Sequence, residues 1–291
     1  MKTAAIADLH DDFWADPVIL NRPKARARHA DALGYTAGNP IGDTLRDVRL
    51  LIVAGDLSNK AAVRWPGALA RLRAAAPEAE ILMLPGNHDY YQGTFDDAKL
   101  ADIAAAHGAR LVQAARVDVP GHAGPVRLLL ATLWTDFALT GDREAGMRAA
   151  GATMNEFRCV RTTGYRKLSP ADTAAVHRAH RDWIAAELAR PFAGRTIVVT
   201  HHAPHPACLA RRGGVQGPLD SAYCSDLSEI LDGPHAPDLW LYGHVHEGAD
   251  TVVGRTELRC ISLGYTDEWG ATPEARAPAA RARIGSLVFD L

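Results

Sequence analysis

Seven side chains with the chemistry of metal ligands stand in five short clusters, each directly after an apolar run of the sequence. They are Asp8 and His10 in IADLH, Asp56 in VAGDLS, Asn87 in LPGNHD, His201 in VTHHAP, and His244 and His246 in YGHVH. Carboxylate, amide and imidazole groups of this kind bind divalent metal ions. Donors that come from successive strand ends are what a two-metal hydrolytic centre requires. The sequence therefore predicts such a centre.

Two pairs of these residues share the same short spacing in the sequence. Asp8 and His10 are two positions apart. In an extended backbone Leu9 points away, so that both side chains lie on the same side. His244 and His246 repeat the spacing, and one imidazole can serve each ion.

The remaining clusters bear on which ligand bridges the two ions and on the net charge of the metal site. Gly55 lets the backbone turn sharply before Asp56, whose two carboxylate oxygens can bridge two ions. Two divalent ions against the carboxylates of Asp8 and Asp56 and one bridging hydroxide leave about one positive charge, which favours a phosphate oxyanion. No cysteine belongs to any cluster, so Mn, Fe, Zn or Co fits better than a thiophilic metal.

The pattern of strands and helices expected around these residues is typical of an α/β protein. Short apolar runs predict buried strands, and Ala-rich stretches between several of them have helical spacing. The strands are expected at Thr3–Ala7, Leu50–Ala54, Ile81–Leu84, Val126–Leu133, Thr196–Thr200, Leu239–Tyr242, Glu257–Leu263 and Ile284–Leu291. The helices are expected at Ala61–Ala75, Phe95–His107, Arg143–Phe157, Pro170–Ala189 and Ser225–Leu231. All five clusters then fall beyond the carboxyl ends of strands, where open α/β sheets bind ligands.

We expect residues 1–291 to form one domain with loop insertions around 11–47, 138–168 and 205–224. The Ala/Pro/Arg run Thr272–Arg283 is interpreted as a surface connection. His177 and His180 are three apart on an expected helix, and their Ala/Arg surroundings indicate a solvated face.

Composition and charge argue against several other classes of protein, without excluding a local basic groove. The chain has 47% hydrophobic and 23% charged residues and a formal net charge of −2, so no overall field attracts nucleic acid or anionic membrane. The four cysteines are scattered and read as reduced thiols. No secretory signal or apolar run of membrane-spanning length is recognised, and we expect a cytoplasmic protein.

The order DxH, GD, GNHD, H and GHxH from Asp8 to His246 resembles the calcineurin-like metallophosphoesterase superfamily. The stretches LWTDF, MNEF, THHAP and LGY further resemble a poorly characterised bacterial group of that superfamily. The resemblance implies two packed mixed β-sheets flanked by helices, with two divalent ions at their edge.

By position in the motif, the resemblance also implies the role of each residue. One metal would be held by Asp8, His10, Asp56 and His246, and the other by Asp56, Asn87, His201 and His244. His88 would donate a proton or position the phosphate, and Asp89 or another acid would orient it. The implied reaction is attack on phosphorus by a hydroxide that both ions share.

Departures from better-known branches bear on the substrate. Ser/Thr protein phosphatases of the superfamily carry the motifs GDxxDRG and RGNHE, and the arginines of these motifs bind a dianionic phosphate monoester. Here the stretches read Gly-Asp-Leu-Ser-Asn from Gly55 and Pro-Gly-Asn-His-Asp from Pro85, without either arginine or the second aspartate. Because a dianion gains more from bidentate arginine than a monoanion does, a small phosphodiester is the favoured substrate. Arg211 or Arg212 could still fold back over the site.

Several alternatives stay open at this stage. A single-strand nuclease would need a basic track, for which Arg158–Lys167 is the local candidate, and nucleic acid is not the favoured partner. A phosphomonoesterase would use the same ions, and a protein-binding scaffold would have lost ligands that this chain keeps. His202 is interpreted as supporting the site or facing substrate. Tyr90 and Tyr91 are expected to pack their loop rather than stack on a substrate, and Trp134 is equally consistent with the core and the cleft.

Overall fold

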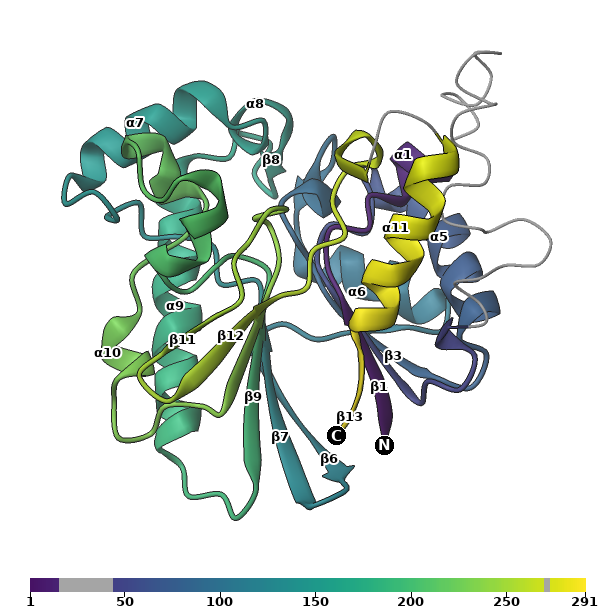
Figure 1. Ribbon diagram of the computed structural model, residues 1–291. Helices are drawn as coiled ribbons and strands as arrows, with labels where there is room; N and C mark the ends of the chain where they lie inside the picture. Colours follow the sequence, from purple (N-terminus) through teal and green to yellow (C-terminus); the bar gives the residue numbers. More distant parts are fainter. Residues whose placement is uncertain (16–43, 270–272) are drawn as a thin grey trace.

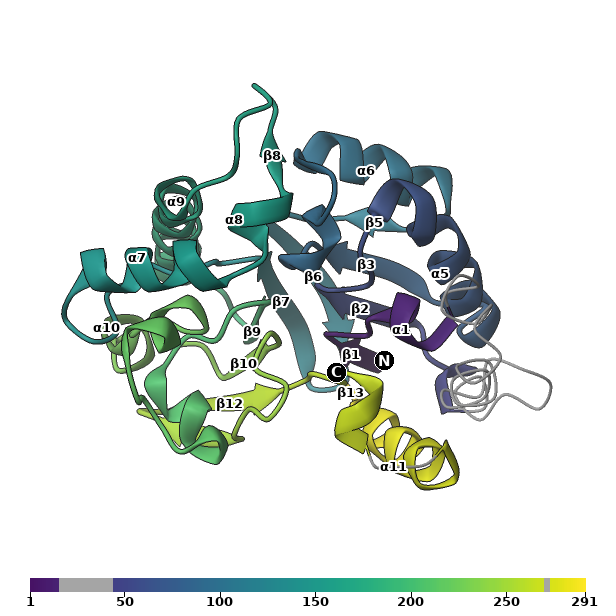
Figure 2. The same cartoon turned by 90° about the horizontal axis from the view of Figure 1, so that it is seen from above.

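Two mixed β-sheets lie face to face at the centre of the molecule, with helices on their outer sides (Figure 1). The view from above shows the same layers, with helices at both outer edges of the paired sheets (Figure 2). The structure is a computed structural model and describes residues 1–15, 44–269 and 273–291. The predicted α/β architecture of two mixed sheets flanked by helices is confirmed.

The first sheet has the strand order β13-β1-β2-β3-β5. Its strands are β1 (Lys2–Ile6), β2 (Leu50–Ala54), β3 (Glu80–Leu84), β5 (Arg110–Leu111) and β13 (Val288–Asp290). The first four run parallel and β13 pairs antiparallel with β1. The helices on this side are α5 (Ala61–Ala75) and α6 (Asp97–Ala106), and the short α1 (Asp11–Ala15) follows β1.

The second sheet has the order β11-β12-β10-β9-β7-β6, with a parallel centre and antiparallel edges. Its strands are β6 (Ala115–Gly121), β7 (Gly124–Ala131), β9 (Arg195–Thr200), β10 (Leu239–Tyr242), β11 (Thr251–Val253) and β12 (Thr256–Cys260). Helices α9 (Pro170–Ala189) and α10 (Ser228–Leu231) lie on its outer side. The remaining elements are β4 (Thr94–Phe95), β8 (Arg161–Thr162), α7 (Arg143–Thr153), α8 (Glu156–Cys159), and the 3-10 helices η1 (His88–Tyr90), η2 (Pro206–Arg212), η3 (Pro218–Ala222) and η4 (Thr266–Trp269).

Alternation along β7 shows how one strand serves two cores. Leu128 and Leu130 belong to the core shared with the first sheet, and Leu129 and Ala131 belong to the core beneath α9. Successive strand residues point to opposite faces, so a continuous apolar run is what a strand covered on both sides requires. This explains why the strand sequences read as unbroken hydrophobic stretches.

The two sheets are joined at the edge where the parallel strands end. The Ala7 amide donates to the Ile261 carbonyl at 2.9 Å, and the Leu263 amide donates to the Ala7 carbonyl at 2.8 Å. The five ligand clusters follow β1, β2, β3, β9 and β10, as the sequence predicts. Parallel strands therefore bring residues from distant parts of the chain to one edge.

Two expectations for the end of the chain are wrong. Pro273–Ser286 forms helix α11, where a surface connection was expected over 272–283, and only Val288–Asp290 of the expected last strand is extended. Ala280 and Ile284 are buried four positions apart in the helix, so packing of this face stabilises a helix despite Pro278. Thr272 lies outside the described residues.

Smaller differences concern the expected loops. The single helix expected at Arg143–Phe157 is two helices, α7 and α8, separated at Met154. Of the stretch 11–47, residues Asp11–Ala15 are helical and 16–43 lie outside the described residues. Within the part of the chain that the structure describes, no helix is both long and apolar enough to cross a membrane.

Candidate metal centre

Asp8, His10 and His246 form the first group of converging donors. One candidate ligand atom from each lies within 4.8 Å of the others. The Nε2 atoms of His10 and His246 are 3.3 Å apart, and Nε2 of His246 is 3.5 Å from Oδ1 of Asp8. The spacing of two residues in the sequence thus brings Asp8 and His10 to one point, although both have a left-handed rather than an extended backbone, with φ values of 54° and 44°.

Asp56, His201 and His244 form the second group, with the same 4.8 Å limit between their candidate atoms. Asn87 joins them through its amide oxygen, which lies 3.1 Å from Nε2 of His201. These residues follow β2, β3, β9 and β10, so both sheets contribute.

Asp56 lies between the two groups. Its Oδ1 is 3.5 Å from Nε2 of His201, and its Oδ2 is 3.9 Å from Nε2 of His10. The carboxylate thus turns one oxygen toward each group, the arrangement that a bridging ligand needs.

The contact between His201 and Asn87 tests whether a cation fits. Nδ1 of His201 donates to the Ala54 carbonyl at 3.0 Å, so the lone pair of the neutral ring is on Nε2. Asn87 Nδ2 donates to the Tyr91 hydroxyl at 2.9 Å, which turns its oxygen toward His201. Two lone pairs therefore face each other. Metal–ligand bonds of about 2.1 Å at right angles separate neighbouring ligands by about 3 Å, so this pair fits one ion.

Glu268 fixes the ring of His246 in the same way. Both carboxylate oxygens accept from Nδ1 of His246, at 2.9 and 3.0 Å, which leaves Nε2 turned toward Asp8 and His10. A carboxylate behind a ligating imidazole sets its tautomer and increases its basicity. Glu268 was missed from the sequence because no motif marks it and it stands 22 residues after His246.

Burial and charge complete the test of fit. Oδ1 of Asp8 and Nε2 of His244 are buried and have no hydrogen-bond partner among the described residues. Burial, together with the charges of Asp8 and Asp89, raises the pKa of Asp56 well above its usual value. Burial lowers the pKa of His201 and His244, so both rings are neutral and present lone pairs. A nearby cation would satisfy the orphaned atoms and favour ionised Asp56, so the donor set fits a pair of divalent cations.

Backbone strain is concentrated at these positions. Asp8, Asp56 and His244 have φ values of 54°, 56° and 63°, in the left-handed region that non-glycine residues seldom occupy. Gly86 has no room for a side chain, since a Cβ there would collide with Oδ1 of Asp56 and the His201 ring. Strain of this kind persists where the surrounding structure enforces it, commonly at functional sites.

His88 is held from both sides beside the two groups. Nδ2 of Asn59 donates to Asp12 at 2.7 Å, which turns the Asn59 oxygen toward Nδ1 of His88 at 3.0 Å. Nδ1 therefore carries the proton of the neutral ring, and Nε2 faces the hydroxyl of Tyr265 at 3.2 Å. Asn59 occupies the position of the second aspartate in GDxxDRG, but sequence reasoning did not identify it as the partner of His88, and it did not single out Tyr265 within LGY.

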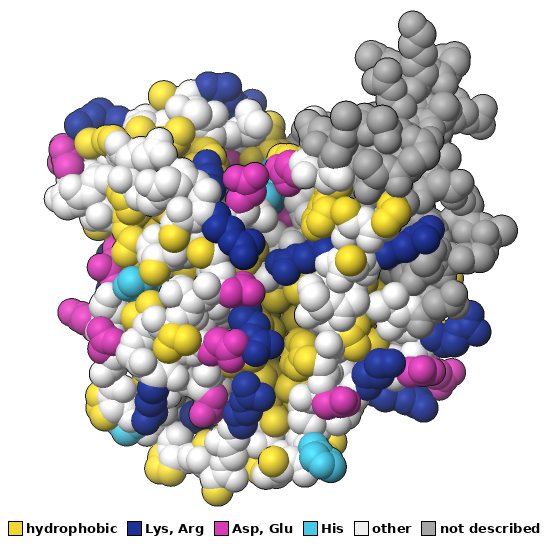
Figure 3. Space-filling model, viewed as in Figure 1, with side chains coloured by type: hydrophobic (Ala, Val, Ile, Leu, Met, Phe, Trp, Pro, Cys, Tyr) yellow, Lys and Arg dark blue, Asp and Glu magenta, His cyan; other side chains and the backbone are white. Residues whose placement is uncertain are grey.

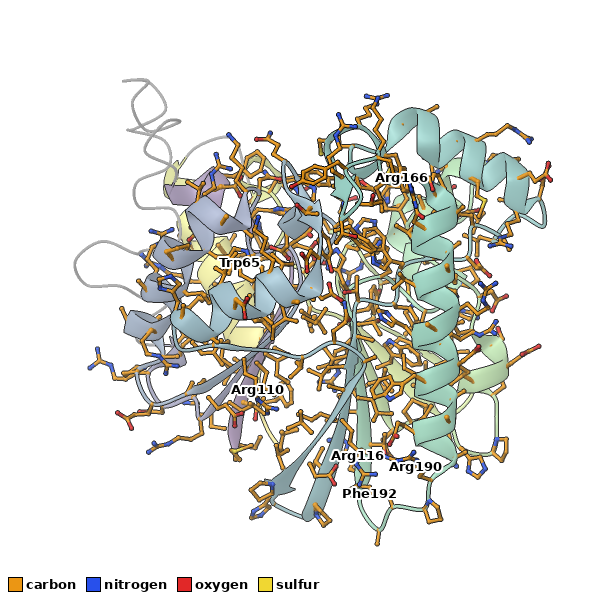
Figure 4. All side chains as sticks on the ribbon, turned by 180° about the vertical axis from the view of Figure 1, so that it is seen from behind. Trp65, Arg110, Arg116, Arg166, Arg190 and Phe192 are labelled. Atoms are coloured by element: carbon orange, nitrogen blue, oxygen red, sulfur yellow. The ribbon has the colours of Figure 1, made fainter. Side chains whose placement is uncertain are left out.

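Asp89 has different partners from those expected. Its carboxylate accepts from the backbone amides of Asp56 and Gly86, both at 2.8 Å, and from the indole of Trp65 at 3.1 Å. Figure 4 places Trp65 on the α5–α6 side of the first sheet. Burial raises the pKa of Asp89 to about 6, although these donors oppose the shift. Asp89 thus ties the loop after β2 to the loop after β3 and does not contact His88 through its carboxylate.

Four of the metal-ligand candidates, Asp56, Asn87, His244 and His246, line a cavity of 380 Å³, which we call the site cavity. Its lining includes Arg212, whose guanidinium stacks over the Tyr223 ring at 4.3 Å. Thus one of the two arginines left open by the sequence does fold over the site. Two acids, Glu247 and Glu268, also line it. In the space-filling view, acidic and basic side chains gather around the groove between the two halves of the molecule (Figure 3).

Other singled-out aromatic residues support the site from within. His202 is buried and its ring lies 4.2 Å from that of His244. Tyr90 and Tyr91 are buried, and the Tyr91 hydroxyl donates to Glu156 at 2.8 Å, while Tyr91 also lines the site cavity. Trp134 is buried in the core.

The prediction for His177 and His180 is wrong. Both are buried, and Nδ1 of His177 lies 3.2 Å from the Trp134 carbonyl. With Thr173 and Ile184 they line the inner face of α9 at helical spacing. That helical spacing was the signal in the sequence that could have identified a buried face. The Ala and Arg residues beside the two histidines lie on other faces of the helix.

Comparisons with known proteins point to one family. A sequence profile described as calcineurin-like phosphoesterase matches residues 1–248. No curated protein matches the chain. Among solved structures, the phosphopantetheinyl hydrolase PptH from Mycobacterium tuberculosis has a TM-score of 0.62 and 19% identity, covering 92% of this chain and 91% of that one. A dimetal phosphatase from Danio rerio has a TM-score of 0.43 and 14% identity, covering 89% and 86%.

Proposed function

Because the chain belongs to the calcineurin-like phosphoesterase family, we propose that it hydrolyses small phosphodiesters with two divalent metal ions. The family and the His/Asp groups together indicate divalent metals. We assign Asp8, His10 and His246 to one ion, Asn87, His201 and His244 to the other, and Asp56 to both. When bound, such ions activate water and neutralise charge on the phosphate oxygens.

The residues of the chain have separate tasks in this proposal. Asp56 orients toward both groups, and Asp89 holds its loop through the backbone amides of Asp56 and Gly86. His88 turns Nε2 toward Asp56 and Tyr265, and once the ring also carries a proton at Nε2, this nitrogen hydrogen-bonds the phosphate or protonates the leaving oxygen. Glu268 keeps the ring of His246 in position.

The observation that supports a diester is the charge of the site cavity. Among the described residues of its lining, Arg212 is the single arginine, and Glu247 and Glu268 also belong to this lining. A dianionic monoester would meet less positive charge here than it needs, while a monoanionic diester would be repelled less.

The loops around the cavity are the proposed determinants of substrate choice within a single domain of residues 1–291. Met154 and Asn155 come from the stretch 138–168, and Arg212 and Tyr223 come from 205–224. Both stretches thus contribute to the wall of the site cavity.

A substrate panel tests the proposal. Metal-stripped protein is reloaded with Mn, Fe, Zn, Co or Mg and assayed with aryl monoesters, aryl diesters, cyclic nucleotides, oligonucleotides and a phosphopantetheinyl ester. The last is included because of the similarity to the phosphopantetheinyl hydrolase. We expect kcat/KM for the aryl diester to exceed that for the matching monoester by about tenfold or more, a difference of roughly 1.4 kcal/mol.

The Arg212→Ala variant sharpens this panel. Loss of the guanidinium should slow the monoester more than the diester, so the preference for diesters increases. Faster release of phosphate from monoesters than from diesters by the unaltered protein would contradict the proposal. If cleavage were confined to oligonucleotides and sensitive to salt, the result would instead favour a nuclease that uses the exposed Arg158–Lys167 segment.

A further inference from the structure

A second cavity of 490 Å³, which we call the flanking cavity, adjoins the site cavity. The two share His246, Glu247 and Glu268 in their walls. The flanking cavity is also lined by Arg211, at the end of η2, and Arg283, in α11. Two guanidinium groups from distant parts of the chain therefore border a space next to the candidate metal centre.

The two arginines differ in how they are held. Arg283 donates from Nε to the Ser262 carbonyl at 3.2 Å and from Nη2 to the Cys260 carbonyl at 2.6 Å, which fixes its position in the wall. Arg211 is exposed and has no ion-pair or hydrogen-bond partner within residues 1–15, 44–269 and 273–291. Its donors are therefore available to a ligand.

Two acids, Glu247 and Glu268, stand beside the two arginines in the described lining. Glu268 accepts from the His246 ring and from the Tyr265 amide, so its oxygens are directed to these donors, and among the described residues neither acid forms an ion pair with Arg211. Figure 3 shows basic side chains on both sides of the groove in this region.

Adjacent arginines also divide between the cavities, since Arg212 lines the site cavity and Arg211 lines the flanking cavity. We infer that the flanking cavity binds a second anionic group of the substrate, a phosphate or carboxylate remote from the scissile phosphate. Guanidinium groups bind such oxyanions through paired, charge-assisted hydrogen bonds. This inference rests on the proposed function, because it takes the site cavity as the place of the scissile phosphate.

Calorimetry with non-hydrolysable probes tests the inference. Manganese-loaded protein is titrated with alkane-α,ω-diphosphonates of two to six carbons and with the alkylphosphonate of each length. At the length that spans the cavities, we expect the diphosphonate to bind at least about tenfold more tightly than the alkylphosphonate of the same length. Arg211→Ala should reduce this ratio to within about twofold, and Arg211→Lys should retain part of it. Arg110→Ala is the matched control, since Arg110 pairs with Glu80 and lines neither cavity (Figure 4).

The outcomes separate this inference from the proposed function. Equal affinity for both probes at every length, or an unchanged ratio in Arg211→Ala, overturns the inference. Diester hydrolysis is measured separately, so it can persist when the second-anion preference is absent. Titration with ω-phosphonocarboxylates distinguishes a bound carboxylate from a bound phosphate. If these probes bind as tightly as the diphosphonates, the second anion is a carboxylate, and if they bind more weakly, it is a phosphate.

Discussion

The Asp56→Asn variant should lose at least roughly 10³-fold in kcat/KM toward an aryl diester, which corresponds to about 4 kcal/mol of transition-state stabilisation. Asp56 turns one carboxylate oxygen toward each group of donors. An amide has one oxygen and no charge, so it cannot replace a bridging carboxylate. Metal analysis of the purified variant should accordingly find fewer than two divalent ions per chain.

The same substitution should leave the metal-free fold intact. Burial and the charges of Asp8 and Asp89 raise the pKa of Asp56 in the folded protein. Without metal, the free energy of unfolding therefore decreases as the pH rises above the pKa of this carboxyl in the unfolded chain, which is near 4. At pH 7 the metal-free variant should therefore melt no lower than the metal-free parent. Asp182→Asn, at an exposed aspartate paired with Arg181, is the control for both assays. Full activity of Asp56→Asn with no bound metal would refute the hydrolytic role of this residue.

The His88→Ala variant is expected to slow diesters with poor alkyl leaving groups by roughly 10²-fold or more, the usual contribution of a general acid. Diesters with a 4-nitrophenyl leaving group should be affected much less, because that oxygen leaves without protonation. Metal content should remain near that of the parent protein, since His88 is not among the seven assigned ligands. Steady-state kinetics across a series of leaving groups checks the expectation.

Two further variants make the test specific. Tyr265→Phe removes the hydroxyl that lies 3.2 Å from Nε2 of His88, and should produce a smaller loss with the same leaving-group dependence. His122→Ala, at an exposed histidine of the β6–β7 turn, should change nothing. Equal losses for alkyl and aryl leaving groups in His88→Ala, with metal retained, would exclude a proton donor and leave the phosphate-positioning role.

The position of the site was predictable because it depends on short-range signals. Apolar runs identify buried strands, and the residue after each run reaches the carboxyl edge of a parallel sheet whatever the length of the connections. Asp8, Asp56 and His201 are of this kind. Asp56 lies after β2 and His201 after β9, in different sheets, yet both reach the joined edge.

The supporting contacts were not predictable in the same way. The partners of His88, namely Asn59 and Tyr265, depend on the paths of two loops. Nothing in the spacing of Glu268 indicates that it would lie behind His246. Asp89 directly follows His88, which suggested a catalytic partner, but the 3-10 turn at His88–Tyr90 directs its carboxylate toward the loop after β2.

Compositional reasoning failed where tertiary packing decided the structure. The proline-containing stretch before β13 forms a helix because Ala280 and Ile284 are buried on one face. His177 and His180 are buried for the same reason. In both helices the spacing of the residues toward the core was more informative than the composition of the segment.

Anomalous diffraction from crystals grown with manganese tests the central claim most directly. We expect two peaks, one on either side of Asp56, each within about 2.0–2.3 Å of one of its carboxylate oxygens. One peak should lie among Asp8, His10 and His246, and the other among Asn87, His201 and His244. Peaks remote from Asp56, or a single ion that leaves one group of donors without a cation, would contradict a two-metal phosphoesterase.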